Sequence, residues 1–81
     1  MVKIYGRDNC SWCKKAVKLA EDYGLNYQYY DIYVEGVRDD FIAKGFKTVP
    51  QIWWGEEHVG DFNQFAQMVE NTIGGYGEGQ F

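Results

Sequence analysis

Two cysteines separated by two residues, Cys10 and Cys13, constrain the fold of this 81-residue chain more than any other feature. They follow Val2–Gly6, an apolar segment with the alternation of a short buried strand. They open an amphipathic segment over Ser11–Tyr23 that has helical periodicity. A disulfide between them closes a loop of about four residues, for which the chain-entropy model gives little stabilisation. We therefore expect the two cysteines to have a chemical role at a strand-to-helix junction and not to serve as a structural cross-link.

The rest of the chain alternates between strand and helix periodicities, giving the predicted order β-α-β-α-β-β-α. The first β-α-β unit requires parallel strands, and the last two strands form an antiparallel hairpin. We therefore expect an α/β fold with a mixed four-stranded sheet and helices on both faces. Trp53 and Trp54 are adjacent in one strand and should face opposite sides. The later elements are predicted as a strand over Tyr27–Ile32, a helix over Gly36–Lys44, strands over Thr48–Trp54 and His58–Gly60, and a helix from Asn63 to Ile73.

The composition of the chain argues against several classes of function. The chain is 46% hydrophobic and 19% aromatic, which is sufficient for the core of one small domain. Twelve acidic residues against eight Lys and Arg give a formal charge of −4 without any basic run, so a nucleic-acid partner is not expected. No apolar stretch approaches the ~20 residues of a membrane span, and Met1–Gly6 has the pattern of a strand, not of a leader. We expect a soluble, cytoplasmic monomer, with one domain over residues 1–73 and a flexible glycine-rich tail over residues 74–81.

The position of the cysteines suggests thiol–disulfide exchange. Cys10 is expected at a helix N-terminus, where free amides and the helix dipole favour a thiolate and lower the pKa of a cysteine. Arg7 and Lys14 can add positive potential, whereas Cys13 lies one turn further in and should be more sheltered. An exposed thiolate beside a sheltered partner suits dithiol exchange, in which Cys10 attacks and Cys13 resolves.

Two other interpretations of the cysteines are open. They can be ordinary buried side chains, or they can bind zinc. Zinc needs four ligands, and the only other soft donor in the chain is His58, so no metal site is expected. We interpret His58 itself as a histidine at a strand end, with a general base as the alternative.

Thr48-Val49-Pro50 is the second motif. Proline lacks the amide hydrogen that a strand needs, so its place at the start of a strand requires a reason. A cis Val49–Pro50 bond would present the backbone of Val49 to an extended peptide beside the cysteines. From the dipeptide alone, an ordinary trans bond is favoured.

Three motifs follow one another along the chain: G-R-D-N-C-S-W-C over residues 6–13, T-V-P-Q-I over residues 48–52 and H-V-G over residues 58–60. Together they resemble the dithiol glutaredoxins of the small bacterial or phage type, over about residues 2–73. The resemblance implies a thioredoxin fold and a cis Val49–Pro50 bond. It also implies glutathione-dependent reduction of protein disulfides and glutathione mixed disulfides, with ribonucleotide reductase as a candidate protein substrate.

The resemblance also implies roles for individual residues. Cys10 is the expected nucleophile, which forms a mixed disulfide with glutathione, and Cys13 is the resolving thiol. Arg7 is expected to meet the glycyl carboxylate of glutathione, Trp12 to flank the sulfur, and Val49 to pair with the cysteinyl backbone. The amides that open the last helix are expected to hold the γ-glutamyl carboxylate. The full expected glutathione-binding set is Arg7, Trp12, Thr48, Val49, Pro50, Phe62, Asn63 and Gln64.

The chain departs from the family pattern at three places. Ser11 replaces the usual proline, and in the family this serine accompanies the sharing of a [2Fe–2S] cluster between two protomers and two glutathiones. Asp61 replaces the second glycine of a pair, and Gln64 replaces an acid. Asp61-x-x-Gln64 matches a helix-capping box, and the alternative is that Asp61 supplies the carboxylate that meets the γ-glutamyl ammonium in the family. The alternatives to glutathione-dependent catalysis are therefore a glutaredoxin-like protein reduced by thioredoxin reductase, and a cluster carrier or sensor.

Overall fold

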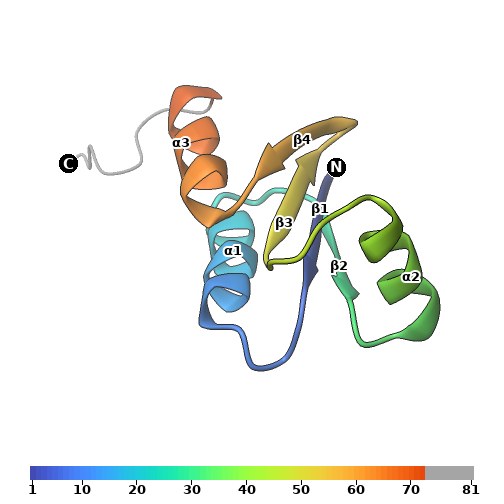
Figure 1. The fold of residues 1–81 in the computed structure, drawn as a ribbon. Helices are drawn as coiled ribbons and strands as arrows, with labels where there is room; N and C mark the ends of the chain where they lie inside the picture. Colours follow the sequence, from blue (N-terminus) through green and yellow to red (C-terminus); the bar gives the residue numbers. More distant parts are fainter. Residues whose placement is uncertain (73–81) are drawn as a thin grey trace.

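The structure is a computed structural model, and it describes residues 1–72. The predicted element order is confirmed (Figure 1). The predicted end of the last helix at Ile73 and the tail over residues 74–81 lie outside the described residues. The elements are β1 (Val2–Gly6), α1 (Ser11–Asp22), β2 (Tyr27–Asp31), α2 (Glu35–Ala43), β3 (Gln51–Trp54), β4 (Glu57–Gly60) and α3 (Phe62–Thr72).

The four strands form one mixed sheet in the order β2-β1-β3-β4. β1 pairs in parallel with β2 and antiparallel with β3, and β3 continues into an antiparallel hairpin with β4. Ile4 of β1 lies opposite Tyr29 on one side and Ile52 on the other. β1 is thus hydrogen-bonded along both edges, and it leads directly into the loop that carries the cysteines.

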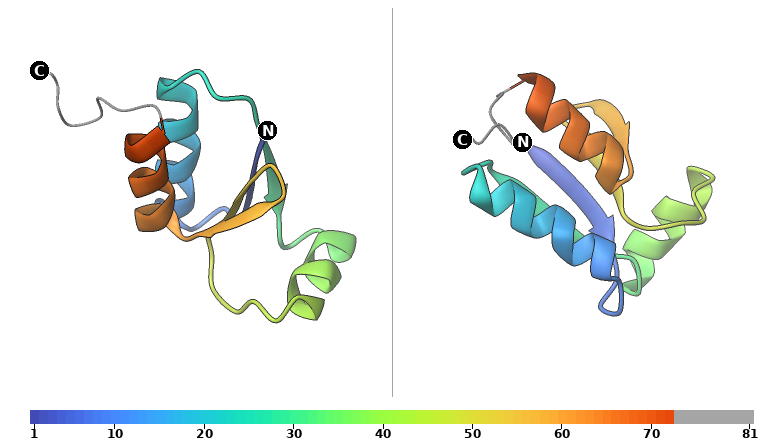
Figure 2. Two further views of the ribbon diagram at one scale, coloured as in Figure 1. Left: turned by 90° about the horizontal axis from the view of Figure 1, so that it is seen from above. Right: turned by 90° about the vertical axis from the view of Figure 1, so that its left-hand side faces the viewer.

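α1 and α3 lie side by side on one face of the sheet, while α2 lies on the other face (Figure 2). The main core fills the space between the α1–α3 pair and the sheet, and Phe65 of α3 is its largest fully buried side chain. Amphipathic periodicity explains this placement, since each of these two helices turns one apolar stripe towards the strands. The core consists of Val2, Ile4, Ala16, Leu19, Ala20, Ile52, Phe65 and Val69.

A smaller aromatic layer covers the opposite face, beneath α2. Tyr5 lies with its ring centroid 5.2 Å from that of Trp53 and 6.0 Å from that of Phe41. Phe46 packs edge-on against Trp53, with the centroids 5.3 Å apart. Trp54, by contrast, packs against the main core. The expectation that the two tryptophans face opposite sides of the sheet is confirmed.

The third strand is shorter than the sequence predicts. It begins at Gln51 instead of Thr48, because Pro50 has no amide hydrogen to give to a sheet ladder. The segment over residues 48–50 is left outside the sheet, next to the start of α1. The Val49–Pro50 bond is cis, as the family resemblance implies and the dipeptide alone does not. Among the described residues, no helix has both the length and the apolar character needed to cross a bilayer.

Candidate active site

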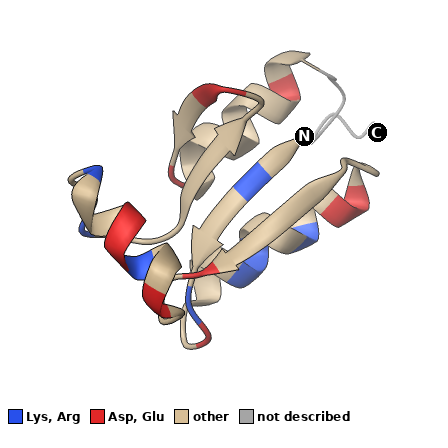
Figure 3. Ribbon diagram, turned by 90° about the vertical axis from the view of Figure 1, so that its right-hand side faces the viewer, with Lys and Arg blue, Asp and Glu red and all other residues tan. Residues whose placement is uncertain are grey.

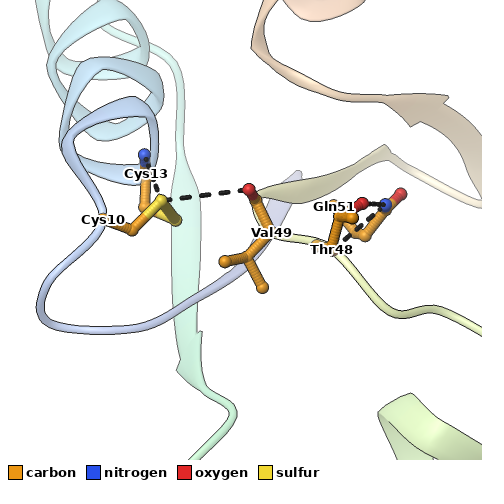
Figure 4. Close-up of a disulfide and its surroundings, with 5 residues drawn as sticks. All are labelled: Cys10, Cys13, Thr48, Val49 and Gln51. Carbon is orange, nitrogen blue, oxygen red and sulfur yellow. Dashed lines mark hydrogen bonds between the residues drawn. A yellow bond between two sulfur atoms is a disulfide. The ribbon is translucent and has the colours of Figure 1, made fainter.

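The two cysteines form a disulfide at the N-terminus of α1. Cys10 occupies the N-cap position in extended conformation, and its Sγ accepts a hydrogen bond from the Cys13 backbone N–H at 3.1 Å. Their Cα atoms are 5.2 Å apart. The same Sγ lies 3.9 Å from the Val49 carbonyl oxygen (Figure 4). The predicted junction is therefore confirmed, with the sulfur of Cys10 between a helix amide and the segment before β3.

The cysteines differ in burial as expected, but Cys10 is less exposed than the sequence predicts. Cys13 is fully buried, whereas Cys10 retains 7% of its surface. The expectation of an openly exposed Cys10 is wrong, because Val49 lies against its sulfur from a distant part of the chain. The order of the two is as predicted: Cys10 keeps a small exposed fraction, and Cys13 keeps none.

Gly6 allows Cys13 to pack this tightly against the end of β1. A Cβ atom at Gly6 would lie 2.8 Å from Cys13 Sγ and 3.0 Å from Cys13 Cβ. Carbon atoms do not approach so closely in proteins, so any side chain at this position would displace the start of α1. The glycine is therefore required by the packing of the sheltered sulfur.

A pocket of about 320 Å³ opens beside the disulfide. It joins three segments that are far apart in the sequence: the first turn of α1, the segment before β3 and the start of α3. Six of the eight residues of the expected glutathione-binding set line it, together with Asp61. The lining residues are Trp12, Thr48, Val49, Pro50, Asp61, Phe62 and Asn63.

Trp12 forms an aromatic wall of this pocket. Its side chain is 48% exposed, and its ring lies 5.6 Å from that of Phe62, centroid to centroid. Lys15 Nζ lies 4.2 Å from the Trp12 ring centroid, within the range of a cation–π contact. The ring is thus held from two sides while its edge is left free for a ligand.

The remaining two residues of the expected set lie outside this pocket. Arg7 lines a neighbouring hollow of about 250 Å³ on the other side of the Thr48–Val49 segment. Lys47 lines the same hollow and was missed by sequence reasoning, although it directly precedes the T-V-P motif. Gln64 lines a different groove, beside α3 and β4. Its side-chain oxygen Oε1 accepts a hydrogen bond from the Asp61 backbone N–H.

Four basic residues lie in α1 and in the loop before it, despite the acidic balance of the chain. Lys14, Lys15 and Lys18 lie on α1, and Arg7 lies in the preceding loop (Figure 3). Acidic residues lie here too, with Asp8 in the same loop and Asp61 in the pocket wall, while α2 carries Glu35, Asp39 and Asp40. The local potential at the disulfide therefore favours anionic ligands more than the net charge suggests.

Comparison with known proteins shows to which family the chain belongs. The sequence model of the glutaredoxin family matches residues 2–59. The chain belongs to the glutaredoxin family. Glutaredoxin 1 of Escherichia coli is 37% identical, in an alignment covering 86% of this chain and 93% of the relative. A glutaredoxin of Vibrio cholerae is 34% identical over 90% of this chain and 94% of its own length.

The solved structures agree with this assignment. Reduced glutaredoxin of E. coli superposes with a TM-score of 0.74 at 34% identity, covering 89% of this chain and 95% of that one. The thioredoxin fold that the family resemblance implies is confirmed. Glutaredoxin membership and a disulfide-forming Cys-x-x-Cys pair together imply thiol–disulfide oxidoreductase activity.

The capping box that the sequence predicts is present at the start of α3. Asp61 Oδ1 accepts a hydrogen bond from the Gln64 N–H at 3.0 Å, and Gln64 Oε1 accepts one from the Asp61 N–H at 3.1 Å. Gly60 has a φ of +118°, and its missing Cβ leaves the space that the Gln64 side chain occupies. The box fixes the first turn of α3, which forms one wall of the pocket.

Replacing Asp61 by alanine should destabilise the protein by about 1 kcal/mol, since it leaves the Gln64 amide without its acceptor. Asp61→Ser keeps a capping oxygen and should recover most of the loss. Urea denaturation of the three proteins measures both effects. Equal stability of the alanine variant and the parent would show that the cap contributes nothing here.

His58 has a structural place in this glutaredoxin. Its Nε2 is hydrogen-bonded to Gln51 Oε1 at 2.8 Å, and Gln51 Nε2 donates to the carbonyl and hydroxyl oxygens of Thr48 at 3.2 Å (Figure 4). Its ring packs between those of Phe46 and Trp53. None of these contacts goes to a cysteine. His58 thus supports, through Gln51, the segment that faces the disulfide.

The described part of the chain, residues 1–72, contains no group of three or more His, Cys, Asp or Glu side chains arranged to hold a metal ion. The cysteines of this glutaredoxin are paired with each other. Glutaredoxins use glutathione as their reductant, and they act on glutathione and on glutathionylated or disulfide-containing proteins.

Proposed function

We propose that this protein catalyses the glutathione-dependent reduction of protein disulfides and of mixed disulfides between proteins and glutathione. The observation that carries the proposal is the place of Cys10 Sγ. It lies at a helix N-terminus, beside a pocket whose walls contain most of the residues expected to bind glutathione. We assign the activity to the domain predicted over residues 1–73.

In the first step, the Cys10 thiolate attacks one sulfur of the substrate disulfide. The substrate S–S bond breaks, a Cys10–substrate disulfide forms, and the other substrate sulfur leaves as a thiolate. The Cys13 amide, 3.1 Å from Cys10 Sγ, supports the proposal because it stabilises negative charge on that sulfur before the attack. The N-terminus of α1 adds the potential of the helix dipole.

In the second step, either of two thiolates attacks the Cys10–substrate disulfide: the Cys13 thiolate attacks Cys10 Sγ, or glutathione attacks the substrate-side sulfur. Attack by Cys13 releases the reduced protein and closes the Cys10–Cys13 disulfide, which two glutathione molecules then reduce. When the mixed disulfide contains glutathione, a second glutathione attacks the sulfur of the first, glutathione disulfide forms, and Cys10 leaves as the thiolate. The second route needs only Cys10, so the two classes of substrate differ in their need for Cys13.

The pocket suggests how glutathione is held. The Val49 backbone is placed to pair with the cysteinyl part beside Cys10, with Thr48 and Pro50 shaping the same wall. The free amides at Phe62 and Asn63 suit the γ-glutamyl carboxylate. Arg7 suits the glycyl carboxylate from the neighbouring hollow. Trp12 flanks the sulfur, and Gln64 contributes through the capping box instead of by direct contact.

The reductant is tested by supplying each candidate separately. We expect reduction of a mixed disulfide between glutathione and a cysteine peptide when glutathione, glutathione reductase and NADPH are present. Thioredoxin reductase with NADPH should support turnover at least tenfold less well, since the pocket is lined for a tripeptide. Faster turnover with thioredoxin reductase would overturn the proposed glutathione dependence.

We further propose a cytoplasmic, monomeric protein whose protein substrates include ribonucleotide reductase. The similarity to bacterial glutaredoxins supports this proposal. Titrating the oxidised ribonucleotide reductase of the same organism against the reduced protein tests the substrate assignment.

A further inference from the structure

Tyr29 lies beside the sheltered sulfur of Cys13, and it is not among the residues that line the pocket proposed for glutathione. It belongs to β2 and is paired with Ile4, so its side chain lies on the face of the sheet that α1 covers. A Cβ atom at Gly6 would lie 2.7 Å from Tyr29 Oη and 2.8 Å from Cys13 Sγ. The hydroxyl and the sulfur therefore border the same small space above Gly6.

The Tyr29 hydroxyl is available to donate to a new acceptor, and the residue is 38% exposed. It makes no hydrogen bond to any residue in the range 1–72, whereas neighbouring Tyr27 donates to Glu21 at 2.7 Å. Burial raises the pKa of Tyr29 above its usual value, and the carboxylates of Asp31 and Asp8 add to the rise. Tyr29 thus keeps its proton at neutral pH and remains able to donate.

Cys13 Sγ needs a donor at one point of the reaction cycle. The sulfur is fully buried, and within residues 1–72 no hydrogen bond reaches it in the disulfide state. When the disulfide opens, Cys13 leaves with the electron pair of the S–S bond. A thiolate that is buried without a hydrogen-bond donor is strongly unfavourable, so it raises the free-energy barrier to opening the Cys10–Cys13 disulfide.

We propose that the Tyr29 hydroxyl stabilises the Cys13 thiolate when the active-site disulfide is opened. An incoming thiolate attacks Cys10 Sγ, a Cys10–thiol disulfide forms, and the Cys10–Cys13 bond breaks. Tyr29 donates a hydrogen bond to the departing sulfur while keeping its own proton, and solvent later protonates the thiolate. The proposal rests on the dithiol cycle proposed above.

The surroundings of Tyr29 suit this role. A hollow of about 420 Å³ beside α1 contains Tyr29 together with Arg7 and Lys14, whose positive charges favour a thiolate nearby. Asp8 opposes them from the same hollow. Tyr29 lines this hollow and is 38% exposed, so solvent reaches the residue and can supply the proton that Cys13 finally takes up.

The test compares Tyr29→Phe with Tyr27→Phe, a matched control that removes a hydroxyl from the same strand and the same hollow. The oxidised proteins are mixed with excess dithiothreitol, and opening of the disulfide is followed by tryptophan fluorescence in a stopped-flow instrument. We expect Tyr29→Phe to open roughly tenfold more slowly, since hydrogen bonds to charged groups are worth about that factor. Tyr27→Phe should open at the parent rate.

A second comparison uses the Cys13→Ser background, in which no thiolate forms at position 13. There Tyr29→Phe should leave the reduction of a glutathione mixed disulfide unchanged. Parent-like opening by Tyr29→Phe, or equal slowing with and without Cys13, would overturn the role of Tyr29. The dithiothreitol measurement requires no glutathione, so it remains informative even if the protein proves to prefer another reductant.

Discussion

Replacing Cys10 by serine should abolish thiol–disulfide exchange, whereas replacing Cys13 by serine should divide the substrates into two classes. A serine hydroxyl is not ionised at neutral pH, so the Cys10→Ser variant has no nucleophile at the end of α1. Cys13→Ser keeps the attacking sulfur, and its mixed disulfide can still be resolved by glutathione. We therefore expect it to reduce glutathionylated peptides at a rate within about threefold of the parent, and to lose most reduction of protein disulfides.

The measurement is NADPH consumption in the coupled glutathione reductase assay, once with a glutathionylated peptide and once with a disulfide protein such as insulin. Intact folding of both variants is checked by circular dichroism. Residual turnover by Cys10→Ser above the uncatalysed rate would contradict the assignment of the nucleophile. Loss of both activities in Cys13→Ser would instead contradict the two-route mechanism.

Replacing Gly6 by alanine should destabilise the oxidised protein by about 2 kcal/mol, the usual range for an overpacked site. The new methyl group would meet Tyr29 Oη, Cys13 Sγ and Cys13 Cβ at 3.0 Å or less. The tyrosine can rotate away, but both Cys13 atoms belong to the first turn of α1, so relief requires that the helix moves. The shift in the urea midpoint measures the cost.

Gly36 provides the matched control. It lies in the first turn of α2, and a Cβ there would meet nothing within 4 Å. Gly36→Ala should therefore equal or exceed the parent in stability, because alanine has the higher helix propensity. Similar losses in both variants would attribute the effect of Gly6→Ala to the backbone and not to the crowded sulfur.

The sequence alone was sufficient for features that depend on neighbours along the chain. Apolar periodicity located the strands and helices because each element turns one face to the core. The capping box was predictable because Asp61 and Gln64 are separated by only three positions and satisfy each other's amides. Cys10 was placed at the start of a helix by the same local argument.

Features that depend on distant parts of the chain were not derivable from the pattern. Cys10 is covered because the Val49 carbonyl, 39 residues away in the sequence, lies against it. The cis Val49–Pro50 bond followed only from the family resemblance, since most such bonds are trans. Tyr29 looks like one of several strand tyrosines until the pairing of β2 with β1 brings its hydroxyl to Gly6.

The central position of β1 has a consequence for how the enzyme meets substrates of different shape. Gly6 is the last residue of a strand bonded on both edges, and its carbonyl still accepts from the Ile32 N–H at 2.9 Å. The cysteines are thus attached to the part of the sheet that opens least readily. The segment over residues 48–50 lies outside the sheet and is braced by the side chain of Gln51. We therefore expect the cysteines to keep their position when a bulky substrate binds, and the segment over residues 48–50 to adjust to its shape.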